Sequence, residues 1–147
     1  MLKLNCDMGE SYGVWKMGDD EAIFPYIDMA NLACGFHASD PMHINTSVLL
    51  AARYNVEIGA HVSYYDLQGF GRRSIPCSYE EIKSKVIYQL GALYGFCKTH
   101  KVSISYVKPH GALYNDMMKD FHIFEAIVDA IASFDSTLRL MILSTSD

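Results

Sequence analysis

MANLACGFHASDPMHINTSVLLAARYNVEIGAH, residues 29–61, contains two short apolar segments with a longer amphipathic segment between them. Met29–Cys34 and Val56–Ala60 have the length and composition of buried strands. Asp40 is placed to cap a helix, and Pro41 stands at the first helical position, where its missing N–H costs nothing. The face that this helix buries is predicted to contain Ile44, Val48, Leu49 and Ala52. A strand, a helix and a strand at this spacing predict a right-handed βαβ unit with parallel strands.

The same alternation extends in both directions along the chain. Further strands are predicted at Leu2–Cys6, Ser103–Val107 and Leu138–Leu143. Ser78 and Glu81 have the spacing of a capping box, and the helix behind them has an apolar stripe of Ile82, Val86, Leu90, Leu93 and Cys97. A helix from about Asp120 has Phe124, Ile127, Val128 and Ile131 on its stripe. Strands that alternate with helices in this way predict an α/β fold with a parallel sheet.

The length of the chain limits how complete such a fold can be. A closed parallel (β/α) barrel usually takes about 250 residues, whereas this chain has 147. We therefore expect a single (β/α) domain over residues 1–147 that corresponds to a C-terminally truncated barrel. Leu138–Leu143 would then form an uncovered apolar edge strand. We expect that edge either to pair with another copy, giving a homo-oligomer, or to mark a form with impaired catalysis.

Composition narrows the class of protein. The formal net charge is −5, and the 12 Lys and Arg residues are scattered, which argues against a nucleic-acid surface. Apolar segments stay well short of the ~20 residues needed to span a bilayer. The four cysteines lack Cys-x-x-Cys spacing and are expected to be reduced thiols of a cytoplasmic protein.

Four polar clusters follow predicted strands, at residues 5–10, 33–40, 59–73 and 108–115. Parallel strands end at the same edge of a sheet, so these clusters are expected to meet where α/β enzymes keep their active sites. Any one of their histidines is more often a loop anchor than a catalytic group, but their recurrence at strand ends favours a site. The candidates are Asp7, His37, His61 and His110. In contrast, His43, His100 and His122 lie in or beside predicted helices and are expected to be structural.

Two kinds of chemistry fit these residue types. Asp7, His37 and His61 could bind a divalent metal with an open position, which lowers the pKa of a water and polarises a carbonyl. The same groups without a metal could act as general acid and base on an amide. The sequence leaves both open, and it contains neither His-Glu-x-x-His nor a known phosphate-binding loop. Arg72 and Arg73 could bind a substrate carboxylate or phosphate, or could form a surface ion pair.

Six segments together resemble the LamB/YcsF family, to which the A subunits of bacterial 5-oxoprolinases belong. They are LNCDMGESYG at 4–13, NLACGFHASDP at 31–41, GAH at 59–61, DLQGFGRR at 66–73, YQLGALY at 88–94 and VKPHGALYN at 107–115. The order and spacing of these segments are specific, and they cover most of the chain. The sequence departs from the family at Ser39, where glycine is usual, and at Val62 and Tyr65, where prolines are common.

The resemblance implies a variant barrel of the glycoside hydrolase/deacetylase type. It also implies ATP-dependent opening of 5-oxo-L-proline to L-glutamate, with ATP as co-substrate and subunits B and C as partners. Because this chain lacks a phosphate loop, phosphorylation of the carbonyl oxygen is expected to belong to a partner. The residues expected to be catalytic are Asp7, His37, His61, Lys108 and His110. Those expected to bind substrate are Glu10, Asp66, Arg72 and Asn115, with Lys108 or Arg72 on the substrate carboxylate.

Two rival functions remain at this point. One is a stand-alone metal-dependent hydrolase or deacetylase acting on an amide or carbohydrate, which the Asp and His residues and the related fold suggest. The other is an inactive remnant that only binds partners, which the short chain suggests. Turnover without ATP or partner subunits distinguishes the first of these from a 5-oxoprolinase.

Overall fold

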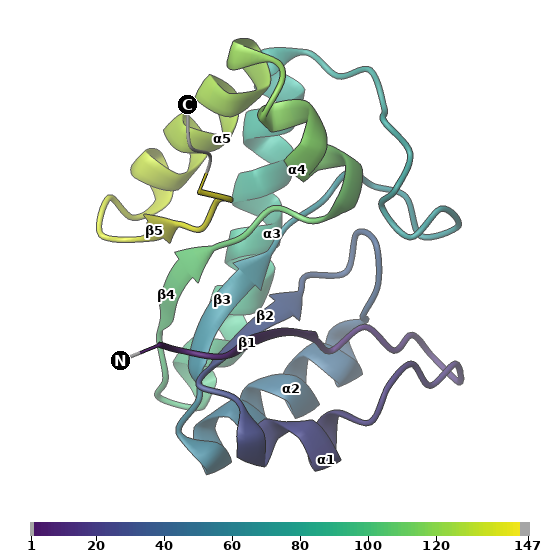
Figure 1. Ribbon diagram of the computed structural model, residues 1–147, viewed down its shortest axis with the longest axis vertical. Coiled ribbons are helices and arrows are strands. Elements are labelled where there is room, and N and C mark those ends of the chain that lie inside the picture. Colours follow the sequence, from purple (N-terminus) through teal and green to yellow (C-terminus); the bar gives the residue numbers. More distant parts are fainter. Residues whose placement is uncertain (1, 145–147) are drawn as a thin grey trace.

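The central element of the computed structural model, which describes residues 2–144, is a five-stranded sheet (Figure 1). All neighbouring strands are parallel, and their spatial order is their order along the chain. This sequential order is the one that a (β/α) barrel requires. The α/β class and the parallel sheet are therefore confirmed. The strands are β1 (Asn5–Met8), β2 (Met29–Ala33), β3 (Glu57–His61), β4 (Ile104–Val107) and β5 (Arg139–Leu140).

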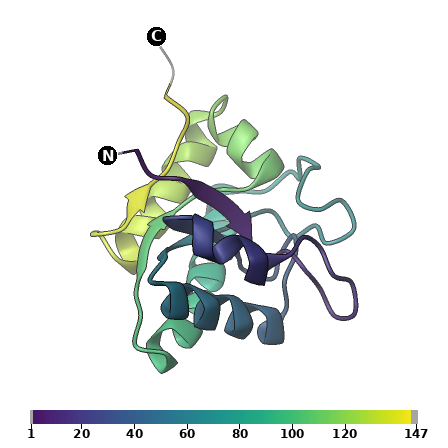
Figure 2. The same ribbon diagram turned by 60° about the horizontal axis from the view of Figure 1, so that its bottom comes forward.

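Three long helices, α2, α3 and α5, follow one another around the sheet. Helix α2 packs against β2, β3 and α3, and α3 packs extensively against α5 (Figures 1 and 2). The apolar core lies between these helices and the strands. The helical elements are α1 (Asp20–Ile23), the 3-10 turn η1 (Phe24–Tyr26), α2 (Pro41–Tyr54), α3 (Tyr79–Thr99), α4 (Gly111–Met117) and α5 (Phe121–Phe134).

Side-chain caps start the long helices where the sequence predicted them. The carboxylate of Asp40 accepts hydrogen bonds from the backbone N–H groups of Met42 and His43 at the start of α2. Ser78 and Glu81 form the predicted capping box at α3. These bonds satisfy N–H groups that have no partner within the helix, and each cap contributes about 1 kcal/mol.

The buried faces of the helices are partly as predicted. All five stripe residues of α3 are buried, which confirms that face. In α2, Ile44 and Val48 are buried, but Leu49 is 45% exposed and the prediction for it is wrong. Val128 of α5 is also exposed, at 36%. In both helices small side chains are buried instead: Ser47 and Ala51 in α2, Ala126 and Ala130 in α5.

The first and last strands differ from the predicted ones. Strand β1 starts at Asn5, because the ladder with β2 begins at the pair Asn5 and Met29, and the preceding Leu2 is exposed. Strand β5 covers only Arg139–Leu140 of the predicted Leu138–Leu143. Its ladder ends because β4 stops at Val107, whose carbonyl accepts the last hydrogen bond, from the N–H of Met141.

Among residues 2–144, no helix combines the length and the apolar character needed to cross a membrane. The four cysteines are all free thiols.

Candidate active site

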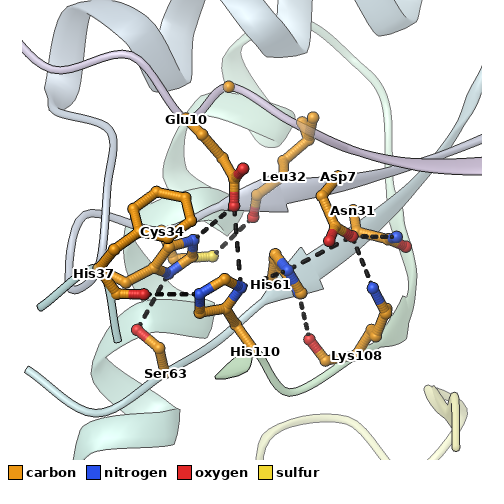
Figure 3. A network of polar contacts seen from close by, with 12 residues as sticks. Asp7, Glu10, Asn31, Leu32, Cys34, His37, His61, Ser63, Lys108 and His110 are labelled. Atoms are coloured by element: carbon orange, nitrogen blue, oxygen red, sulfur yellow. Dashed lines mark hydrogen bonds and ion pairs between the residues drawn. The ribbon is translucent and has the colours of Figure 1, made fainter. Parts of the chain in front are cut away.

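Three buried histidines and two carboxylates meet at the carboxyl end of the sheet (Figure 3). They come from four successive strand ends: Asp7 is in β1 and Glu10 follows it, His37 follows β2, His61 ends β3, and His110 follows β4. Ligand atoms of Glu10 and of the three histidines all lie within 4.8 Å of one another. We call these four residues the His–Glu cluster. Its donor atoms are of the kind that hold a metal ion, and they are equally suited to acid–base chemistry.

Backbone carbonyls fix the orientation of two of the histidines. His61 Nδ1 lies 2.7 Å from Lys108 O, and His110 Nε2 lies 2.8 Å from Phe70 O. A carbonyl oxygen only accepts, so each of these nitrogens carries a hydrogen and donates it. The other two ring nitrogens, His61 Nε2 and His110 Nδ1, face each other at 3.0 Å.

His37 lies face to face with His110, with ring centroids 3.7 Å apart and planes 8° from parallel. Its Nε2 is 2.9 Å from Glu10 Oε1, and its Nδ1 is 3.0 Å from Ser63 Oγ. His37 therefore links a buried hydroxyl to the carboxylate of the cluster, and this chain of contacts holds Glu10 in place.

Asp7 stands beside the cluster in a network of its own. Its Oδ1 is 2.6 Å from Lys108 Nζ, 2.8 Å from Asn31 Nδ2 and 3.4 Å from His61 Nε2. Burial opposes the ionisation of Asp7, but its contacts with His61, Lys108 and Asn31 outweigh burial and hold its pKa well below the usual range. Asp7 is therefore a permanent anion at the mouth of the site.

The register of the sheet places the support for Asp7. Asp7, Asn31, Gly59 and Tyr106 pair in turn across β1 to β4. The Tyr106 ring lies over Gly59, where a Cβ would come within 2.1 Å of it, so glycine is required there. From that position the Tyr106 hydroxyl donates to Asn31 Oδ1 at 2.7 Å, and Asn31 donates to Asp7. This row of residues holds the carboxylate from behind.

The loop between β3 and α3 closes over the histidines. Gly71 has φ +65°, and a Cβ there would lie 2.8 Å from the Cβ of His37 and 2.9 Å from a ring carbon of His110. Both the left-handed backbone and the lack of space require glycine. The carboxylate of Asp66 accepts from Gly69 N–H and Arg73 Nε, which pins the loop from within.

Burial controls the charge state of the cluster. It lowers the pKa of His37 to about 3 and of His110 to about 4, and neighbouring imidazoles lower both further. Burial also raises the pKa of Glu10. In each case the cause is the cost of placing a charge away from water. The imidazoles of His37 and His110 are therefore mostly neutral at neutral pH.

Cavities open on two sides of the cluster. One, of about 570 Å³, is lined by polar groups that include Asp7, His61, His110, Lys108 and Arg72. The other, of about 350 Å³, lies against Glu10 and His37 and is mainly apolar, with walls from Tyr12, Trp15 and Phe70. We call them the polar and the apolar cavity. The polar one offers two cations to an anionic ligand.

The structure brings together most of the residues that the sequence singled out. Asn115, in α4, lines the polar cavity. Asp66 lies elsewhere: its buried carboxylate is taken by Arg73 and the loop backbone, and it lines neither cavity. The helix α4 that carries Asn115 was missed, because Lys108-Pro109-His110-Gly111 has the composition of a loop.

Sequence reasoning also missed the residues that hold the site from behind. Asn31, Ser63 and Tyr106 are all buried and bonded to site residues. Two signals could have found part of this support. Asn31 is a polar residue inside an apolar strand, and Gly59 is a glycine inside a strand, which often marks a close approach by another group.

The fold and the site together define a class of protein: a parallel α/β protein with a buried site of histidines and carboxylates at the carboxyl ends of its strands. The LamB/YcsF family model matches residues 2–147. The chain therefore belongs to the LamB/YcsF family.

Similar proteins have related names. The chain is 59% identical to a Vibrio vulnificus protein named as the A subunit of 5-oxoprolinase, over 99% of this chain and 58% of that one. It is 54% identical to a 5-oxoprolinase A subunit of Pseudomonas aeruginosa, with the same coverage. The crystal structure of the lactam utilization protein from Thermus thermophilus superposes with a TM-score of 0.95 at 46% identity, over 97% of this chain and 57% of that one. The chain thus spans rather more than half the length of these relatives.

Proposed function

We propose that this protein acts as the A subunit of an ATP-dependent 5-oxoprolinase in the cytoplasm, opening the lactam of 5-oxo-L-proline to L-glutamate with subunits B and C. The names of its relatives support this reaction. The observation that carries the proposal is the polar cavity, where the facing His61 and His110 share one space with the cations Lys108 and Arg72. A lactam with a carboxylate needs both kinds of group.

The chemistry of a lactam explains the need for ATP. An amide carbonyl is a poor electrophile, and phosphorylation of its oxygen makes the carbon far more reactive. Since the sequence contains no known phosphate-binding loop, we assign this activation to the partner subunits. In the remaining steps a water oxygen bonds to the carbonyl carbon, the C–N bond breaks, and the ring nitrogen takes up a proton. This leaves the phosphoryl group on the new carboxyl, and a second water hydrolyses that acyl phosphate to L-glutamate and inorganic phosphate.

The residues of the polar cavity suit the first of those steps. His61 and His110 each direct an unshared ring nitrogen into the site, so they can accept the proton of the attacking water. Asp7 stays ionised beside His61 and stabilises the positive charge that then develops on the imidazole. Arg72, which lines the cavity together with Asn115, is the group we assign to the substrate carboxylate, because Lys108 is already paired with Asp7.

An assay of glutamate formation tests the proposal. The protein is mixed with 5-oxoprolinase subunits B and C, ATP and 5-oxo-L-proline, and glutamate is measured. We expect turnover that requires all components, and a fall of at least about 100-fold for His61→Ala, in line with the loss of a general base. Arg53→Gln is the matched control for Arg72→Gln, since Arg53 pairs with Glu21 on the surface rather than lining the cavity. No glutamate above the level of subunits B and C alone would reject the proposal.

A second function is favoured by one observation, the metal-binding character of the His–Glu cluster. A stand-alone metal-dependent amide hydrolase or deacetylase would use such a cluster without ATP. Turnover of 5-oxo-L-proline or of acetylated sugars by the protein alone, with a divalent metal and no partner subunits, would favour this function over the first.

A further inference from the structure

One pair of atoms in the His–Glu cluster lacks a hydrogen between them. His61 and His110 each donate one ring hydrogen to a backbone carbonyl, at Lys108 and Phe70. A neutral imidazole has only one such hydrogen, so His61 Nε2 and His110 Nδ1 present lone pairs to each other across 3.0 Å. Two lone pairs at this distance repel each other. The geometry therefore requires a positive species between them, either a metal ion or an extra proton.

The rest of the cluster is satisfied with neutral histidine and ionised glutamate. The Ser63 hydroxyl lies 3.0 Å from both His37 Nδ1 and the Tyr64 carbonyl oxygen. When its hydrogen points to His37, His37 Nε2–H donates to Glu10 Oε1. In that arrangement no further proton is needed between Ser63 and Glu10. The demand for a positive charge is thus confined to the pair of His61 and His110, with the Glu10 carboxylate beside it at 3.8 Å from His110 Nδ1.

Ring geometry decides which histidines can be ligands. The lone pair of an imidazole nitrogen lies in the plane of its ring. His37 and His110 are stacked almost parallel, so their lone pairs cannot converge on one ion. His61 stands nearly perpendicular to His110, at 86°, and its Nε2 does converge with His110 Nδ1. His37 is therefore a positioning residue that holds Glu10, rather than a ligand.

We propose that His61 Nε2, His110 Nδ1 and Glu10 Oε1 bind one divalent first-row transition ion, such as Zn²⁺. Bonds of 2.0–2.1 Å at tetrahedral angles put ligand atoms about 3.3 Å apart, and the separations of 3.0 and 3.8 Å lie on either side of that value. Two imidazoles and a carboxylate, with a position left open, is a ligand set of catalytic zinc sites. Of the three ligands expected from the sequence, only His61 is in this set. Glu10 and His110 take the place of Asp7 and His37.

The surroundings of the three ligands have the features of a prepared metal site. Metal-binding histidines commonly donate the N–H of their other ring nitrogen to a backbone carbonyl, as His61 and His110 do here. The ligand carboxylate is itself held, by His37. Asp7 lies outside the set, because its Oδ1 is occupied by Lys108 and Asn31. In catalysis, where this inference rests on the proposed function, such an ion would occupy the two ring nitrogens that could otherwise accept a proton. It would instead polarise a carbonyl and acidify a water.

Calorimetry with Zn²⁺ on protein freed of metal by chelation and dialysis tests the site. We expect one ion per chain for the wild type. His110→Gln and Glu10→Gln should each weaken binding by more than about 100-fold, since losing even an outer partner of a ligand costs about 10–100-fold. The matched control is His100→Gln, because His100 contacts Asn45 far from the cluster. Circular dichroism of each variant verifies the fold.

Nitrogen NMR of the histidine rings separates a metal from a shared proton. Zn²⁺ should shift the signals of His61 Nε2 and His110 Nδ1 and leave the ring nitrogens that face Lys108 and Phe70 protonated. The inference is overturned if Zn²⁺ leaves both signals unchanged, or if His110→Gln binds as tightly as His100→Gln. Tight binding without any 5-oxoprolinase activity would reject the proposed function and leave the metal site standing.

Discussion

The two sides of the His–Glu cluster place their carboxylates in opposite environments. On one side Asp7 contacts a lysine, a histidine and an amide donor, and these keep its pKa low. On the other side Glu10, only three residues further on, lies against an apolar cavity, and burial raises its pKa. Both groups are carboxylates, so their neighbours decide that Asp7 is a paired anion with a low pKa and that Glu10 is a candidate ligand for a cation.

The largest expected effect comes from removing the charge of each of the two carboxylates, Asp7 and Glu10, in separate variants. Asp7→Asn and Glu10→Gln should each lower glutamate formation by about 100–1,000-fold, because one stabilises a charged histidine and the other completes the cluster. Glu10→Gln should also weaken Zn²⁺ binding by more than about 100-fold. Asp7→Asn should weaken it by only about 10-fold, since Asp7 is an outer neighbour. The measurements are glutamate assays with subunits B and C and calorimetry.

A control for charge alone is Glu57→Gln. Glu57 is at the amino end of β3 and pairs with Lys3 and Arg139, at the opposite end of the sheet from the site. The Glu57→Gln variant should keep both glutamate formation and Zn²⁺ binding near the wild-type values. Equal loss of Zn²⁺ binding in Asp7→Asn and Glu10→Gln would show that the two sides are not distinct.

The next effect concerns the hydrogen bond between Tyr106 and Asn31, which supports Asp7 from behind. Tyr106→Phe removes the hydroxyl that donates to the buried Asn31, leaving that acceptor without its partner. We expect the free energy of unfolding to fall by about 1–3 kcal/mol. Urea denaturation measures this fall, and the dependence of the unfolding free energy on urea concentration should stay unchanged. Tyr79→Phe is the control, because its hydroxyl bonds Asp129 at the surface, and it should show no measurable loss. A Tyr106→Phe protein as stable as the control would contradict the supporting role of the Asn31 contact.

A third effect concerns the loop that carries His37 on the Glu10 side. Asp40 ends this loop; burial opposes its ionisation, but bonds from Gly13 N–H, His43 N–H and the His43 ring lower its pKa to about 2. A depressed folded pKa stabilises the fold above the unfolded pKa of about 3.9, and the contribution is lost as pH falls from about 4 to about 2.

Asp40→Asn keeps a capping side chain but cannot titrate. Its unfolding free energy should therefore fall less steeply than the wild type's between about pH 4 and pH 2, with a difference near 1 kcal/mol or less at pH 7. Chemical denaturation across this range measures it. Parallel curves for the two proteins would show that the Asp40 contacts do not stabilise the folded state.

The sequence predicted those parts of the molecule that depend on local pattern. The stripe of α3 follows from its helical period, and the caps at Asp40 and Ser78 follow from short side-chain reach. The meeting of Asp7, His37, His61 and His110 follows from parallel topology, which puts all strand ends at one edge. Such features need no knowledge of distant contacts.

What the sequence could not supply was the angle and partner of each side chain. The stacking of His37 on His110 makes one of them a support and the other a candidate ligand, and nothing in the spacing of the two residues indicates this. Asp66 looked like a site residue because it lies in a motif with arginines, but the turn of its loop directs it to Arg73. The short β5 likewise depends on where its neighbour β4 ends.

The smallest effect concerns Ser39, in the same loop as His37. Ser39 has φ +71°, in the left-handed region that disfavours a side chain by about 1–2 kcal/mol. Its buried hydroxyl also has no hydrogen-bond partner among residues 2–144.

The variant Ser39→Gly relieves both costs. It also loses about 0.5–1 kcal/mol of stability, because glycine has greater freedom in the unfolded chain. We therefore expect a net gain of about 0.5–1 kcal/mol from the backbone, with any gain from removing the hydroxyl added to it, seen as a rise of a few degrees in Tm. Ser39→Ala separates the two causes, since it removes the hydroxyl but keeps the strained backbone. A gain in Ser39→Gly that exceeds that in Ser39→Ala assigns the difference to the backbone, which explains why glycine suits this position. A loss of stability in Ser39→Gly would instead mean that the hydroxyl has a partner, such as an ordered water, that stabilises the loop holding His37 against Glu10.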